Sequence, residues 1–204
     1  MIRMKCALSA AALVAAAAAS AAGAPLNLVS VNPDVASIGV AVSYNATTQT
    51  FTASGRTQNL LLPSLVSVPL GNVRQFLLTA IIDNNGNLAG PGSLTVRGDY
   101  NVSDELLFSS NTISAFGFSA FNKFEFVFIQ QAGSLAPVGT PIGTILVEAG
   151  LSFAGGVPDF HSSFDSAFFP GGPGTGNADT FVPAPASAGL VVGLGAMSAR
   201  RRRR

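Results

Sequence analysis

Short apolar runs alternate with turn residues through the middle of the chain, a pattern that predicts β-strands. The clearest alternation is KFEFVFI at 123–129, where three phenylalanines point to one face and Lys123, Glu125 and Val127 to the other. Further strands are predicted over residues 37–44, 49–55, 73–83, 92–100 and 142–149. Because no helical period is sustained, we expect one all-β body over residues 25–167, an antiparallel β-sandwich or flattened barrel.

A turn and a cluster of aromatic residues add detail to this body. The sequence DNNGN at 83–87 predicts a tight turn between two pairing strands, because Asn and Gly adopt positive φ at low cost. Six phenylalanines fall between Phe116 and Phe128, and we expect them to form the aromatic core. Residues 168–181 are rich in Gly and Pro and are expected to be a linker.

The first residues have the three parts of a secretory signal peptide. Arg3 and Lys5 precede an apolar run from Ala7 to Ala19, and small residues follow it. The run is shorter than the roughly 20 apolar residues that span a membrane, so a retained anchor is disfavoured. We therefore expect residues 1–22 to be removed by signal peptidase.

The chain ends in a proline-containing tetrapeptide, a short apolar stretch and a basic cluster. The tetrapeptide is Val182, Pro183, Ala184 and Pro185, and the apolar stretch runs from Ala186 to Ala199. As a helix, these 14 residues would span about 21 Å, which is short of the roughly 30 Å hydrocarbon core. The cluster is Arg200, Arg201, Arg202, Arg203 and Arg204, and the positive-inside rule would hold it on the cytoplasmic side.

This order over residues 182–204 resembles the PEP-CTERM tail of bacterial exosortase substrates. Val182, Pro183 and Pro185 match the usual Val-Pro-Glu-Pro motif, whereas Ala184 stands where the family has glutamate. The resemblance implies an exosortase-type processing enzyme as partner, and exopolysaccharide as a further one. It also implies that the exported chain is held transiently in the inner membrane by the C-terminal helix and then reaches the cell surface or the extracellular matrix.

Other interpretations of the tail are a plain membrane anchor and a basic tail that binds nucleic acid. The short, glycine-containing apolar stretch disfavours the anchor. Nucleic acid is disfavoured by the middle of the chain between the two basic ends, where four basic residues against ten acidic ones give a net charge of −6. A glycolipid-anchor signal would end in apolar residues without the arginines.

The body shows little that indicates chemistry. His161, the only histidine, has Asp159 and Ser162 beside it, but chain neighbours on a strand point in different directions, which disfavours a catalytic triad. Cys6, the only cysteine, precedes the expected cut, so the mature chain is expected to lack disulfides and thiolate metal sites. We expect no enzyme activity and no cofactor; a secreted hydrolase with an unrecognised site stays as an alternative.

Two binding hypotheses are kept. Asp83, Asn85 and Asn87 place oxygens at alternate positions, as a calcium loop does, although a hairpin turn is the simpler interpretation. Asp99, Asp104 and Glu105 would add oxygens if the loops meet. The other hypothesis is a carbohydrate-binding module, disfavoured by the absence of Trp and by only two tyrosines, Tyr44 and Tyr100.

Overall fold

The computed structural model describes residues 24–29, 32–71, 74–119, 122–135, 142–150, 153, 158–166 and 176–181. The described residues form strands and turns and contain no α-helix, so the predicted all-β fold is confirmed. The strands are β1 (Asp34–Asn45), β2 (Thr50–Leu61), β3 (Ser67–Pro69), β4 (Gln75–Ile82), β5 (Leu88–Gly98), β6 (Glu105–Ser110), β7 (Ile113–Ser119), β8 (Lys123–Ile129), β9 (Ile142–Glu148), β10 (Phe164–Asp165) and β11 (Gly176–Phe181).

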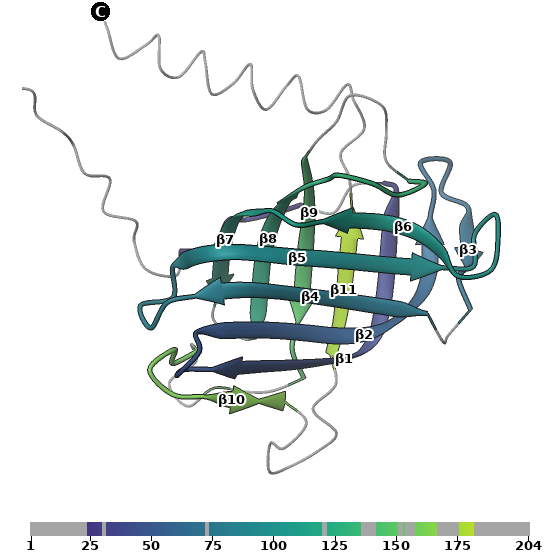
Figure 1. Ribbon diagram of the computed structural model, residues 1–204. Helices are drawn as coiled ribbons and strands as arrows, with labels where there is room; N and C mark the ends of the chain where they lie inside the picture. Colours follow the sequence, from purple (N-terminus) through teal and green to yellow (C-terminus); the bar gives the residue numbers. More distant parts are fainter. Residues whose placement is uncertain are drawn as a thin grey trace, which may run out of the picture.

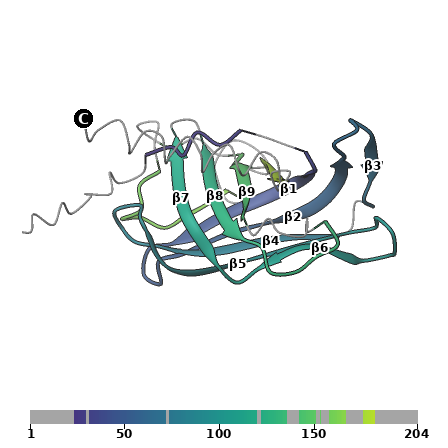
Figure 2. The same cartoon turned by 90° about the horizontal axis from the view of Figure 1, so that it is seen from above.

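All of these strands belong to one antiparallel sheet of 11 strands. Its order is β6-β5-β4-β2-β1-β11-β9-β8-β7, with β3 attached to β2 and β10 to β1. Figure 1 shows the strands of one half, β1, β2, β4 and β5, crossing in front of β7, β8, β9 and β11. In Figure 2 the two halves lie as layers, one above the other. The sheet therefore curls into a half-barrel, sandwich-like in section, in which hydrogen bonds between β1 and β11 join the layers.

The core lies between the two layers and is rich in phenylalanine. Phe51 of β2 has its ring 5.0 Å from that of Phe124 and 5.2 Å from that of Phe126, both on β8. Phe108 of β6 contacts Phe128 of β8 with ring centroids 6.4 Å apart. These five rings are fully buried. Of the six phenylalanines predicted to form the core, Phe118, Phe124, Phe126 and Phe128 are buried in it, Phe116 packs against it, and Phe121 lies outside the described residues.

All six predicted strands are found: β1, β2 and β5 extend beyond a predicted end, whereas β4 and β9 are shorter than predicted. The run at 123–129 is β8, and its three phenylalanines face the core as expected. The predicted pairing across residues 83–87 is the β4–β5 hairpin, closed by hydrogen bonds between Asp83 and Asn87 and between Gly86 and Asp83. Strands β6 and β7 were not singled out from the sequence, because their apolar residues alternate less regularly.

The boundary between body and linker is corrected by the structure. Residues 176–181, expected as the end of a linker over 168–181, form β11. This strand lies between β1 and β9 and pairs with both over most of its length. Three of its residues, Ala178, Thr180 and Phe181, are buried. The body therefore includes residues beyond 167, and its last strand is supplied by a segment whose composition is typical of a linker.

Candidate functional site

The predicted signal peptide, residues 1–22, and the predicted sorting residues, 182–185 and 200–204, lie outside the described residues. Their points of attachment to the body are described. Phe181, the last residue of β11, is the register partner of Asp34, the first residue of β1. The start of the sheet and its end therefore lie side by side, and the predicted motif begins at the residue after the last buried strand position.

The calcium candidates form the turn between β4 and β5. The Asp83 carboxylate accepts hydrogen bonds from the backbone N–H groups of Asn85 at 2.9 Å and Asn87 at 2.8 Å. Its second oxygen accepts from the Asn87 side chain at 3.3 Å. Burial raises the pKa of Asp83, but these hydrogen bonds outweigh it and hold the pKa below its usual range. Both carboxylate oxygens thus accept hydrogen bonds from within the turn. This arrangement fits a hairpin turn better than a calcium loop.

Asp159, His161 and Ser162 lie together on one exposed turn. His161 Nδ1 is 3.3 Å from one oxygen of Asp159, and Ser162 Oγ donates to the other at 3.2 Å. A nucleophile triad needs the serine on the histidine and the aspartate behind it. Here the serine and the histidine both contact the aspartate, and the His161 and Asp159 side chains are 70% and 65% exposed. This geometry is that of a capped turn.

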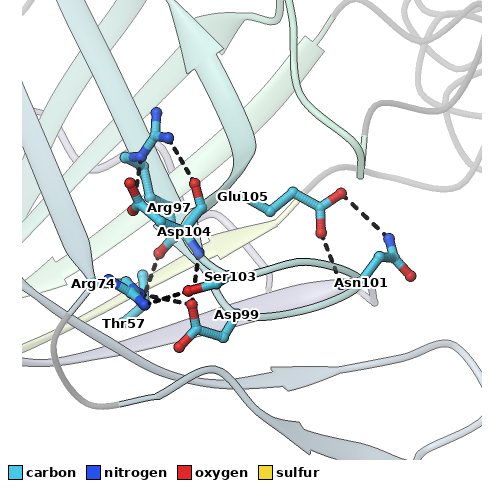
Figure 3. A network of polar contacts seen from close by, with 8 residues as sticks. All are labelled: Thr57, Arg74, Arg97, Asp99, Asn101, Ser103, Asp104 and Glu105. Carbon is cyan, nitrogen blue, oxygen red and sulfur yellow. Dashed lines mark hydrogen bonds and ion pairs between the residues drawn. The ribbon is translucent and has the colours of Figure 1, made fainter.

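Two of the three carboxylates at the β5–β6 end, Asp99 and Asp104, lie close together around two arginines, whereas Glu105 points toward Asn101 (Figure 3). Arg74 Nε is 2.6 Å from Asp99, and Arg97 Nε is 2.9 Å from Asp104. Asp99 also accepts the Asp104 backbone N–H at 2.7 Å. The hydrogen bond from Arg74 lowers the pKa of Asp99, and that from Arg97 lowers the pKa of Asp104.

The same network ties the loop to its neighbours. Arg74 also donates to Ser103 Oγ at 2.7 Å, and Thr57 Oγ1 donates to the Arg97 carbonyl at 2.7 Å. Glu105 accepts the Asn101 backbone N–H at 2.8 Å, which lowers the pKa of Glu105. Each carboxylate of the network therefore has donors from the protein, as expected of a structural brace. Among the described residues, no group of three or more His, Cys, Asp or Glu side chains could hold a metal ion.

An open hollow of about 610 Å³ lies on the outer side of the sheet, where β1, β2 and β10 meet. Seven of the nine residues that line it carry hydroxyl, amide or carboxylate side chains: Ser43, Asn45, Thr48, Thr50, Thr52, Ser163 and Asp165. The other two are Tyr44 and Phe164, whose rings stack on each other. Strand alternation produces this wall, because Phe51 and Ala53 of β2 face the core while Thr50 and Thr52 face outward.

A row of polar side chains continues from this hollow across the sheet. Asp165 pairs with Ser43, Ser43 with Thr52, and Thr52 with Thr79. Thr79 pairs with Ser93, and their hydroxyls are 2.7 Å apart. The row runs over five strands with one carboxylate at its end. No local pattern in the sequence reveals this row, because its residues are far apart along the chain and only the strand register aligns them.

The two tyrosines considered for sugar binding lie differently. Tyr44 is 2% exposed, and its hydroxyl donates to the Ile82 carbonyl at 2.8 Å. Burial, with a smaller contribution from the Asp83 charge, raises the pKa of Tyr44. Tyr100 is partly buried against the core. Tyr44 therefore belongs to the core side of β1, and its hydroxyl supports the end of β4 next to the turn.

The described residues contain no helix long and apolar enough to cross a membrane. Comparisons of the chain with protein-family models, curated proteins and solved structures find no match. Any proposal about its function therefore rests on the residues of this chain.

Proposed function

We propose that the protein is an exported, non-enzymatic component of the cell surface or extracellular matrix, sorted by an exosortase-type enzyme. The observation that carries this proposal is the tail: a Val-Pro-x-Pro motif, a short apolar stretch and five arginines, at the opposite end of the chain from a signal-peptide pattern. In this proposal residues 186–199 form a short membrane helix. The arginines hold it until the enzyme cuts at or near Val182–Pro185.

The architecture suits a cargo that is cut at this point. Phe181 is 1% exposed and closes the last strand, and Val182 follows directly. A cut beyond Phe181 leaves every described strand intact, so the released body keeps its whole sheet. The body would stand close to the membrane before the cut, because no linker separates β11 from the motif.

The test compares two variants of the tail. Moving arginine into a bilayer centre costs roughly 2.5 to 3.5 kcal/mol per residue on insertion scales, so serine at all five positions should let the tail pass through uncut. Pro183→Ala with Pro185→Ala should keep the arrest but lose recognition, and uncut protein should accumulate in the membrane. Mass spectrometry of wild-type protein outside the cell should find an end between Val182 and Ser187. Mature protein that still carries Arg204 would refute the sorting proposal.

The polar hollow favours a second candidate, binding of a neutral polysaccharide. Its hydroxyls and amide can exchange hydrogen bonds with sugar hydroxyls. Thr50→Val with Thr52→Val removes two hydroxyls from the wall while keeping its shape. Binding to immobilised polysaccharide should fall, whereas the matched variant Thr95→Val, outside the hollow on β5, should bind as wild type does. Equal retention of all three proteins would remove this candidate.

A further inference from the structure

A buried carboxylate on the outer face of the sheet holds the first described residues of the chain. Glu125 lies on β8 between two inward phenylalanines, so its side chain points outward, yet it is only 6% exposed. Its oxygens accept three consecutive backbone N–H groups: Leu26 at 2.5 Å, Asn27 at 3.2 Å and Leu28 at 3.0 Å. A buried carboxylate needs such donors, because an uncompensated charge is costly to desolvate.

The segment at 24–28 is shaped to offer those donors. Asn27 has φ of 56°, the left-handed region, where Asn is one of the few side chains found regularly. A left-handed residue can turn successive N–H groups toward one point, and such a concave arrangement of N–H groups binds anions. Leu26 and Leu28 are half-buried while Asn27 between them is exposed. The segment thus presents its N–H groups and two leucines to the sheet.

The sheet is shaped to receive the segment at a glycine. Gly117 of β7 is the register partner of Glu125 and lies on the same outer face. A Cβ at Gly117 would be 2.6 Å from the Ala24 carbonyl oxygen and 2.8 Å from Leu26 Cγ. Figure 2 shows the purple N-terminal segment passing over β7 and β8 on the side away from the core. Gly117 and Glu125 therefore form a surface that fits a peptide backbone, and we call these two residues the seat.

We propose that Gly117 and Glu125 form a binding site for the N-terminus that removal of the signal peptide creates. Its ligand class is a peptide segment with apolar side chains that turns three backbone N–H groups toward a carboxylate. The part of this inference that concerns signal-peptide removal rests on the proposed function; the seat itself does not. The expected cut after Ala22 lies two residues before Ala24, whose backbone packs on Gly117. Signal peptidase needs the residues around the cut to be free of the sheet. Removal of the signal peptide therefore comes before the binding of residues 24–28 to Gly117 and Glu125.

The test measures hydrogen exchange at the amides of Leu26, Asn27 and Leu28 in mature protein recovered from outside the cytoplasm. These amides should be protected in wild type. In Glu125→Gln they should exchange about tenfold faster or more, as the loss of a charge-assisted hydrogen bond predicts. The matched control is Glu148→Gln, which removes the same charge from the neighbouring strand, where Glu148 pairs with Lys123 at 2.8 Å. It should leave the three amides protected.

A second pair of variants avoids changes in the sheet. Asn27→Gly should keep the protection, because glycine accepts positive φ, whereas Asn27→Val should lose it, because a β-branched residue there is strained. Three outcomes count against the seat: unprotected amides in wild type, no effect of Glu125→Gln, or equal protection in the two Asn27 variants. Protected amides in a chain that retains Met1 would refute the claim that signal-peptide removal comes before binding, but would not refute the binding site itself. A retained Arg204 would refute the sorting proposal and leave this one.

Discussion

The β4–β5 hairpin and strand β11 belong to the same sheet but obtain their partners in different ways. In the hairpin, Asp83 organises a turn within five residues, and the two strands it joins are neighbours in the chain. Strand β11 pairs instead with β1, which begins at Asp34, far away in sequence. The hairpin is specified by local turn chemistry. The sequence of β11, GNADTF, has little strand character, and its conformation is imposed by the two strands that flank it.

Removal of β11 is expected to have the largest effect on folding. A chain of residues 24–181 should fold with a β-type circular dichroism spectrum and a cooperative melt. A chain of residues 24–167 should not, because β1 and β9 both lose a hydrogen-bonded partner in the middle of the sheet. Cooperative melting of the shorter chain would show that β11 is an accessory strand and that the linker boundary at 168 is functionally correct.

A single buried residue of β11 should have the next largest effect. Phe181→Ala removes a ring that is 1% exposed, and large-to-small changes of this kind cost about 3 to 5 kcal/mol. The exposed Asn177 on the same strand provides the control, and Asn177→Ala should stay within about 0.5 kcal/mol of wild type. Denaturant unfolding gives both values. A similar loss for the two variants would mean that backbone pairing, not burial, holds β11.

The local turn should contribute less. Asp83→Ala leaves two backbone N–H groups without their carboxylate and should lower the free energy of unfolding by about 1 to 2 kcal/mol. Asn85→Ala keeps the N–H that Asp83 accepts and should change little. Because the pKa of Asp83 is lowered on folding, its contribution is present above the unfolded pKa and is lost as pH falls through the folded pKa. Wild type and Asp83→Ala should therefore converge in stability in strong acid, which denaturant titrations across the acid range can follow.

The smallest expected effect belongs to Asp179, an outward residue of β11. Burial raises the pKa of Asp179, and the charge of Glu148 on β9 raises it further. A carboxyl whose folded pKa is raised favours folding least when it is ionised, so stability falls as pH rises from the unfolded pKa through the folded one. Asp179→Asn should raise the melting temperature at neutral pH and change it little below about pH 3, where the carboxyl is neutral in both states. A variant less stable than wild type at neutral pH would contradict this sign.

The sequence by itself determined the parts of this protein that depend on near neighbours. Strict alternation identified β8 and its buried phenylalanines, and DNNGN identified the turn that joins β4 to β5. Even that turn has a tertiary component. Gly86 has φ of 78°, which the sequence anticipates, but a Cβ there would also lie 2.8 Å from Phe118 of β7, which it does not. The expected targeting segments at the two ends are likewise sequence patterns, and they stay predictions.

Only the tertiary structure decided which outward positions are buried and which weak segments become strands. Glu125 alternates as a solvent-facing residue, and it is buried because a segment nearly 100 positions away lies over it. The polar row from Asp165 to Ser93 exists only because the register aligns side chains of five strands. Strand β11 forms because β1 and β9 present unpaired N–H and C=O groups on either side of it, and a backbone can satisfy these whatever its side chains. Pairing of this kind depends on which backbones meet in space, and local sequence does not encode it.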